Sequence, residues 1–410
     1  MNDHQASTAH IGIFYHSDPA GHVPSGIDSF VRGILQWAPP DLQYSLFGAT
    51  SDSAARPVGR EAAIRLGDRK ISYLPIVSID PAAARSFIPL TLQYMRSLHK
   101  ILGTQRIATL DILDFHRIEP GYLFRKDPRP KNVLLHQDMS VIRDKNSDIK
   151  WRHFPWAYER IERSLFNRLD RIFCVRESAV ERYAKLYPAM ARKFAFIPTW
   201  VDTSIYGPGR ADDRANSRRQ LQIGATTKLL VFVGRLDRQK DPLLLLEAFR
   251  IALEHDNELR LVLIGDGTLR AKVEEVSQSE KLRGRVTVTG ALSRPEIANV
   301  LRAADLFVMS SAYEGMPIAV LEALATGLPV VSTDVGELRR VVRNGLNGYL
   351  SEGHTPALLA DAILQALSRL SEIRGTPCES SVAPYHPEKV LSLIYENHRR
   401  QAARINRPHQ

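Results

Sequence analysis

Apolar runs of four or five residues alternate with longer amphipathic stretches along the second half of this chain. Runs this short favour buried strands, and the stretches between them are long enough for helices. Strands are predicted near residues 229–233, 260–264, 286–289, 305–309 and 330–333. Helices are predicted near residues 242–255, 269–282, 295–303, 317–327, 337–343 and 356–370. This regular alternation predicts an α/β domain with a parallel, doubly wound sheet.

The first half shows the same alternation with longer loops. Strands are predicted at residues 10–16, 111–115, 132–135 and 171–175, and helices at 28–37, 156–168 and 178–186. Asp28 is placed to cap the first of these helices. Residues 84–105 have apolar positions at helical spacing mixed with basic ones. They fit a helix that faces the core or, alternatively, one that docks on a membrane surface.

The boundaries between these blocks predict two domains. The first covers residues 1–202 and the second residues 203–383. The polar run Gly207–Arg219 is interpreted as a linker. Residues 384–410 follow a proline break and contain a last helix, Tyr385 to about Arg400. A chain of 410 residues is long enough for two such cores.

The stretch Ser311–Pro329 has the most specific pattern in the chain. A predicted buried strand precedes it, and Pro317 is placed as the first residue of a helix. Gly327 and Pro329 are placed to end that helix. The segment therefore predicts a strand, a tight loop and a helix in that order.

Two carboxylates flank the start of this helix. Glu314 lies in the loop, Glu322 lies on the helix, and Gly315 and Met316 present backbone N–H groups between them. Amides that bind an anion, next to carboxylates that bind hydroxyls, suit a nucleotide sugar. The alternative is an ordinary strand–helix unit with two surface glutamates, since the spacing recurs in the C-terminal helix, where it is interpreted as a solvated face.

The first turn of the second domain supplies positive charge. Gly234 ends a predicted strand, and Asp241 and Pro242 cap and open the next helix. Arg235 and Lys240 lie between them and can neutralise a diphosphate, arginine through a fork of donors and lysine as a point charge.

Histidines end two strands of the first domain. His116 and His136 follow predicted strands, and ligands of open α/β sheets bind beyond the carboxyl ends of strands. They are candidates for a site, although a structural role is equally compatible with the pattern. Asp138, Arg129 and Lys131 lie in the neighbouring loops and, like His116, are candidates for contacts with an acceptor. The two basic residues suit an acceptor that is anionic.

The charge of the chain is uneven. Residues 1–200 hold 28 Lys and Arg against 20 Asp and Glu, and the whole chain carries +10. A basic half attracts anionic partners such as phosphorylated substrates or lipid head groups. No nucleic-acid-binding signature accompanies this charge, so nucleic acid is not expected as a partner.

Targeting signals are absent from the pattern. No stretch approaches the ~20 apolar residues that span a bilayer, and the polar N-terminus does not resemble a secretory signal. The two cysteines, Cys174 and Cys378, have no metal-binding or disulfide spacing, which favours the cytosol.

Gly26 follows the first strand and lets a ligand approach the backbone, but no G-x-G-x-x-G is present, which disfavours a dehydrogenase.

Together these motifs resemble family 4 of the retaining glycosyltransferases. The resemblance covers nearly the whole chain and is strongest from Leu229 to Leu350. It implies the GT-B fold, in which two Rossmann-like domains face each other and the last helix crosses back to the first domain. The second domain would hold a nucleotide sugar and the first domain an acceptor.

The resemblance also implies residue roles. The residues implied to bind the donor are Gly26, Gly234, Arg235, Lys240, Gly315, Met316, Pro317 and Glu322. Catalysis is implied for Glu314, Arg235, Lys240 and His136, without a cofactor. No Asp-x-Asp occurs in the chain, so no metal is expected. Two departures, Glu337 and Arg340 where the family has a glycine and an acid, leave the preferred donor open.

The motifs and the family resemblance together predict a metal-independent, retaining hexosyltransferase. The expected donor is a UDP- or GDP-sugar, and the expected acceptor is a saccharide, lipid-linked on the evidence of the basic first half and of the resemblance. Exopolysaccharide or surface glycan assembly in the cytoplasm, at the inner face of the membrane, is the expected setting. The alternatives are a sugar-nucleotide epimerase on the same two-domain plan and a non-catalytic protein that binds nucleotide sugars.

Overall fold

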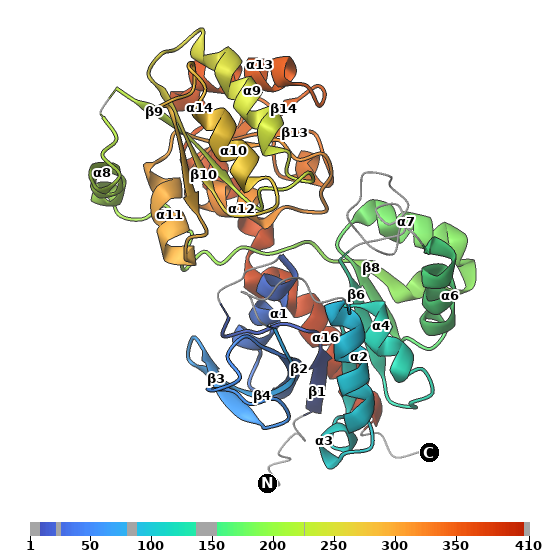
Figure 1. Ribbon diagram of the computed structural model, residues 1–410. Helices are drawn as coiled ribbons and strands as arrows, with labels where there is room; N and C mark the ends of the chain where they lie inside the picture. The colour runs from blue at the N-terminus through green and yellow to red at the C-terminus, as the bar shows by residue number, and fades with distance from the viewer. Residues whose placement is uncertain (1–8, 22–25, 80–87, 137–153, 225, 406–410) are drawn as a thin grey trace, which may run out of the picture. The chain divides into compact units, whose positions relative to one another are not determined.

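The computed structural model describes residues 9–21, 26–79, 88–136, 154–224 and 226–405 (Figure 1). The chain divides into two compact units, each with its own sheet. Unit 1 comprises Met1–Pro198 with Pro387–Gln410, and unit 2 comprises Thr199–His386. The predicted domain boundaries, after residue 202 and before residue 384, lie within four residues of these divisions.

The sheet of unit 1 has eight strands among the described residues, in the order β3-β4-β2-β1-β5-β6-β7-β8. Their bounds are β1 Ala9–Phe14, β2 Leu42–Thr50, β3 Ala62–Leu66, β4 Arg69–Ser78, β5 Ile112–Phe115, β6 Lys131–Leu135, β7 Arg171–Cys174 and β8 Phe194–Phe196. All neighbours pair in parallel except β3, which pairs antiparallel with β4. This antiparallel pair lies at one edge of the sheet, where Gly67, with φ +57°, turns the chain back.

Helices cover both faces of this sheet. Their bounds are α1 Gly26–Gln36, α2 Leu90–Ile101, α3 Gln105–Ala108, α4 Ile118–Leu123, α6 Pro155–Phe166, α7 Glu177–Leu186, the 3₁₀ helix η2 Pro188–Lys193 and α16 Pro387–Ile405. Asp28 lies inside the first turn of α1 rather than at its cap, where its charge still favours the positive helix end.

Helix α16 returns from the end of the chain and packs on β1, β2 and β5 of unit 1. Polar contacts fix its position as well as apolar ones. Tyr44 and His398 share a hydrogen bond of 2.8 Å, and Gln401 bonds to Asn132 at 3.0 Å. Buried polar groups need such partners, so the register of α16 on the sheet is well defined.

The sheet of unit 2 is entirely parallel among the described strands, in the order β11-β10-β9-β12-β13-β14. Its strands are β9 Lys228–Val233, β10 Leu259–Ile264, β11 Val286–Gly290, β12 Leu306–Met309, β13 Val330–Thr333 and β14 Gly348–Ser351. The predicted doubly wound sheet is confirmed here. Its last strand, β14, was not predicted, because four residues after a turn carry little periodic signal.

Most helices predicted for unit 2 are present, but two predictions fail, and the short helices between residues 370 and 381 were not predicted. They are α8 Ala211–Gln220, α9 Pro242–Leu253, α10 Arg270–Ser277, α11 Arg294–Ala303, α12 Ile318–Ala325, η3 Leu338–Arg340, α13 Pro356–Ser368, α14 Leu370–Ile373, α15 Thr376–Ser381 and η4 Ala383–Tyr385. The predicted helix at 337–343 is only the short 3₁₀ turn η3. The predicted linker at 207–219 is wrong, because most of it is α8.

Arginines rather than apolar side chains attach α8 to the unit. Arg214 donates to Asp305 at 2.6 Å, and Arg218 donates to the same carboxylate at 3.1 Å. The hydrophobic pattern on which the prediction relied therefore carries no sign of this helix.

Among the described helices, none is both long and apolar enough to cross a bilayer. The predicted helix at 84–105 is α2, which buries Tyr94 and Leu98 against unit 1. The apolar face of α2 is thus largely a core face. Leu92, at 54% exposure, is on its outer side.

Candidate functional site

In unit 2 the strand order reverses between β9 and β12. From β9 the chain moves outward to β10 and β11, and from β12 it moves the other way to β13 and β14. Ligands of open α/β sheets bind at such a switch point, beyond the carboxyl ends of the strands. The turn that follows β9 and the loop that follows β12 therefore meet where a ligand is expected.

The turn after β9 has a rigid backbone. Asp241 has φ +43°, and its side chain accepts from the backbone N–H of Leu244 at 3.2 Å, as predicted for the cap of α9. A Cβ on Gly265 would lie 1.9 Å from the carbonyl oxygen of Gly234. The turn and the neighbouring strand end are therefore packed backbone to backbone, which holds the turn in one conformation.

Lys240 and Glu314 join the two loops. The Lys240 Nζ lies 2.6 Å from the Glu314 Oε1, and the two side chains are only 15% and 8% exposed. The backbone N–H of Ala312 also donates to the carbonyl of Gln239 at 2.8 Å. A shielded ion pair with this geometry holds one cation and one carboxylate next to each other at the edge of the sheet.

Arg235 lies on the same turn but is far more open, at 67% exposure. Its guanidinium contacts the Asp237 carboxylate at 2.8 Å and the Gln239 side chain at 3.0 Å. Most of its five donors remain accessible to an anion in solvent.

The loop after β12 leads into α12 through Gly315, Met316 and Pro317. Pro317 is the N-cap of α12 rather than its predicted first residue. Within the described residues the backbone N–H groups of Gly315 and Met316 donate to no protein acceptor, whereas the Gly315 carbonyl accepts from Glu337 at 2.9 Å. These amides are available to an anion at the positive end of α12.

Glu322, one turn further along α12, sits in a cluster that the sequence analysis did not foresee. The Tyr206 hydroxyl lies beside its carboxyl. Arg294 lies beside it and also contacts Asp202 at 3.3 Å. Burial raises the pKa of Glu322 to about 7, while Arg294 and Tyr206 act in the opposite direction.

This raised pKa gives a prediction for stability. The folded protein holds a proton on Glu322 between pH 4.5 and about 7 that the unfolded chain has released, so the wild type loses stability as pH rises through this window. Glu322→Gln removes that loss, worth about 3 kcal/mol before solvent screening reduces it. Calorimetry should therefore show that the melting temperature of the variant rises relative to that of the wild type between pH 5 and pH 8. An equal difference in melting temperature at the two pH values would contradict the raised pKa of Glu322.

In unit 1 the strand order reverses between β1 and β5, and two histidines meet at that edge. The His116 Nδ1 and the His136 Nε2 lie 3.2 Å apart, with the rings stacked. Burial lowers the pKa of His116 to about 4 and the pKa of His136 well below its usual range. Both rings are neutral at pH 7, so one N–H is shared between them. The sequence predicted only that the two histidines lie at equivalent strand ends, and the structure shows that they are in direct contact.

His16, at the end of β1, was not among the predicted candidates. It lies beside Tyr94 of α2, with the ring centroids 6.0 Å apart, and burial lowers its pKa to about 4. It follows a strand just as His116 and His136 do, so the same pattern would have identified it.

Other predicted candidates in unit 1 lie elsewhere. Lys131 begins β6, at the opposite end of that strand from His136, and donates to two backbone carbonyls. Arg129 is bound to Asp127 at 2.6 Å. The structure therefore does not bring these two residues to the histidine pair, and their contacts stabilise the loop. Gly26 begins α1, and Asp138 lies outside the described residues.

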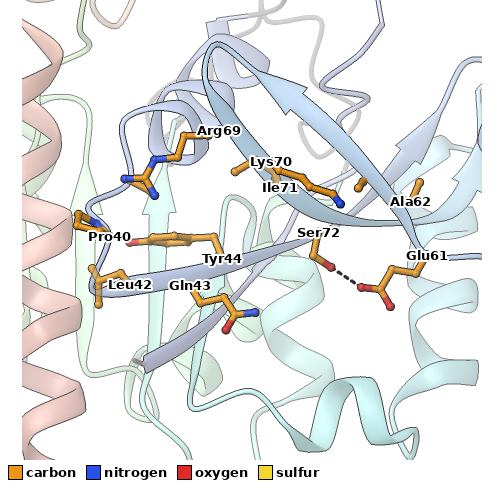
Figure 2. Close-up of a pocket in the computed structure, with 12 residues that line it drawn as sticks. Pro40, Leu42, Gln43, Tyr44, Glu61, Ala62, Arg69, Lys70, Ile71 and Ser72 are labelled. Atoms are coloured by element: carbon orange, nitrogen blue, oxygen red, sulfur yellow. Dashed lines mark hydrogen bonds between the residues drawn. The ribbon is translucent and has the colours of Figure 1, made fainter. Parts of the chain in front are cut away.

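A hollow of about 760 Å³ lies in unit 1, near the amino ends of β2 and β4 (Figure 2). Arg69, Lys70 and Glu61 are among the residues that line it. This is the edge of the sheet opposite to the histidines, so the hollow is not part of the predicted site. Among the described residues, no group of three or more His, Cys, Asp or Glu side chains could hold a metal ion.

The chain matches known sequences over most of its length. Residues 213–372 match the family model described as glycosyl transferases group 1. A D-inositol 3-phosphate glycosyltransferase of Nocardia farcinica is 30% identical over 85% of this chain and 78% of that protein. The UDP-Gal:alpha-D-GlcNAc-diphosphoundecaprenol alpha-1,3-galactosyltransferase of Escherichia coli is 28% identical over 73% and 72%. With a D-inositol 3-phosphate glycosyltransferase of Corynebacterium urealyticum, 30% identical, the match spans 62% of this chain and 60% of that relative.

Solved structures show the same fold. Sucrose-phosphate synthase from Thermosynechococcus elongatus has a TM-score of 0.78 at 20% identity, covering 97% of this chain and 100% of that one. Anabaena HepE, in complex with UDP and glucose, has a TM-score of 0.71 at 17% identity, covering 94% and 98%. The predicted GT-B fold, with two Rossmann-like α/β domains, is confirmed.

Proposed function

This chain belongs to the glycosyl transferases group 1 family, and we propose that it moves a hexose-type sugar from a UDP- or GDP-sugar to a saccharide acceptor with retention of configuration. In the proposed reaction, the bond between the anomeric carbon and the diphosphate breaks, and the diphosphate keeps the electron pair. The acceptor hydroxyl oxygen bonds to the same face of the anomeric carbon, and its proton passes to the departing phosphate.

The observation that carries the proposal is the Lys240–Glu314 pair at the switch point of unit 2. Lys240 retains further N–H donors beyond the one directed at Glu314, and these suit the growing charge of the diphosphate. Arg235 and the N–H groups of Gly315 and Met316 add donors on the same edge. In this assignment Glu314 accepts hydroxyls of the sugar, and Glu322 accepts hydroxyls of the ribose. Positive charge held in place before the reaction makes a metal unnecessary.

For the acceptor we propose the histidine edge of unit 1. His116 is buried, but His136 is partly exposed, and the ring nitrogen of His136 that does not face His116 can bond to a hydroxyl group of a saccharide. The excess of basic residues in the first half favours an acceptor that carries phosphate at an anionic membrane surface. The name of the Escherichia coli relative describes such an acceptor, a sugar on diphosphoundecaprenol. We therefore favour a lipid-linked saccharide in surface glycan or exopolysaccharide assembly.

A thermal-shift screen against UDP-, GDP- and ADP-sugars tests the donor assignment. A bound donor stabilises the folded protein by about 2.7 kcal/mol at a hundred times its dissociation constant, so the true donor should give a clear rise in melting temperature. No shift with any member of the panel would contradict the proposal. Product analysis with the donor that binds then decides the reaction, since a free epimer would indicate an epimerase and unchanged donor a binding protein.

A further inference from the structure

Tyr206 is a buried tyrosine whose hydroxyl is not explained by packing alone. It is 1% exposed and packs in the apolar core of unit 2. A buried hydroxyl costs free energy unless it is hydrogen-bonded, and phenylalanine would fill the same volume without that cost. The hydroxyl of Tyr206 lies beside the Glu322 carboxyl, whose pKa it lowers. The phenol oxygen is therefore best explained by Glu322 and not by packing.

Arg294 completes the cluster from another element. It is the first residue of α11, its guanidinium carbon lies 5.6 Å from the centre of the Tyr206 ring, and it contacts Asp202 at 3.3 Å. The Asp202 side chain is only 1% exposed and also accepts from the Ser204 backbone N–H at 3.2 Å. Arg294 is thus paired with Asp202, and its positive charge also lowers the pKa of Glu322.

We propose that Tyr206 and Arg294 are positioning residues for the donor, which hold the Glu322 carboxylate so that it can accept hydrogen bonds from the ribose hydroxyls. This inference rests on the role proposed for Glu322. Tyr206 donates to one oxygen and fixes the rotamer, and Arg294 stabilises the negative charge from the side. The second oxygen is left for the ligand. Neither residue touches the reacting atoms.

The charged groups around Glu322 make the effect dependent on pH. Tyr206, Arg294 and Asp202 are the titratable groups that act on it, and Asp202 opposes the other two. Loss of the Tyr206 donor should raise the pKa of Glu322 further, which protonates it near neutral pH. A variant without the Tyr206 hydroxyl should therefore bind the ribose-containing ligand weakly at pH 7 and regain affinity as the pH rises towards 8.5, when the Glu322 carboxyl ionises again.

The test compares Tyr206→Phe with wild type by calorimetry. The ligands are the nucleoside diphosphate that binds best among UDP, GDP and ADP, and its 2′,3′-dideoxy analogue. The variant should bind the ribose form about ten- to a hundredfold more weakly at pH 7, as expected for a hydrogen bond to a charged group. Its affinity for the dideoxy analogue should be unchanged. Tyr349→Phe, which removes a hydroxyl bonded to Arg369 at 3.3 Å elsewhere in unit 2, is the matched control.

Two further variants separate positioning from packing. Arg294→Met should weaken binding of the ribose form, and Arg294→Lys should recover part of it. Tyr206→Phe should cause no further loss in a Glu322→Gln background. Equal loss of both ligands in Tyr206→Phe, or no loss of either, would overturn the inference. If instead the wild type binds no nucleoside diphosphate, the proposed function itself fails, and the two failures are thus distinguishable.

Discussion

Replacing Lys240 with alanine is expected to lower turnover by about a hundred- to a thousandfold, the usual cost of removing one preorganised contact to a developing charge. The Lys240 ammonium is fixed beside Glu314 by a 2.6 Å contact and is shielded from water. In the proposed mechanism, its interaction with the departing diphosphate is stronger in the transition state than in the ground state. We therefore expect the loss mainly in kcat, measured with the donor found in the thermal-shift screen.

Folding must be separated from catalysis in this experiment. Lys240→Ala leaves the 8% exposed carboxylate of Glu314 without its cation, which destabilises the fold. The double variant Lys240→Ala/Glu314→Gln removes the unpaired charge and should melt near the wild-type temperature while remaining inactive. Lys281→Ala, which breaks an exposed pair with Glu254, is the matched control. Wild-type turnover in Lys240→Ala would rule out the proposed role.

The spacing of apolar residues predicted most elements of unit 2, because each of these elements buries a short apolar run or one apolar face. Strands such as β9 and β12 are short apolar runs, and helix caps such as Asp241 have a local signature. These features depend on neighbours in sequence, so one sequence is enough to predict them. Lys240 and Glu314 each follow a predicted strand, and the carboxyl ends of parallel strands lie at one edge of a sheet, so the two residues were expected on the same edge before their contact was known.

Elements held by other forces were missed. Helix α8 has almost no apolar face and is attached by Arg214 and Arg218 to Asp305, about 90 residues away in sequence. Strand β3 of unit 1 covers an edge of the sheet and is half-exposed, so its apolar signal is weak. Both cases depend on tertiary contacts that a local pattern does not contain.

The surroundings of Glu322 were unpredictable for the same reason. Its position on α12 was clear from the sequence, but its partners come from the segment around Asp202 and Tyr206 and from the start of α11. The raised pKa of Glu322 arises from burial that only the folded unit creates. Ionised Glu322 lowers the stability of the fold, and it lies beside the helix end that is proposed to bind the phosphates. A carboxylate that is costly to the fold in this position is expected of a ligand site.

Replacing Gly336 with alanine is expected to abolish most of the activity without touching any proposed ligand contact. Gly336 has φ +61°, and a Cβ built there would lie 2.1 Å from the carbonyl oxygen of Gly315 and 2.7 Å from that of Glu314. Backbone cannot yield as a flexible side chain does, so the loop that carries Glu314 must move. A displacement of about 1 Å in a catalytic group costs roughly a hundredfold in rate. Steady-state kinetics and the thermal shift with the donor should both show the loss.

The control variant, Gly284→Ala, separates the effect of the steric clash from the effect of a left-handed backbone conformation. Gly284 has φ +72° and no atom within 4 Å of a built Cβ. Gly284→Ala therefore carries the strain of a left-handed residue, about 1–2 kcal/mol, without any displacement of a neighbour. It should lower the melting temperature and leave kcat unchanged. If Gly336→Ala behaved in the same way, losing stability but not turnover, then the Glu314 loop would tolerate movement, and the proposal that its rigid geometry stabilises the departing diphosphate would be wrong.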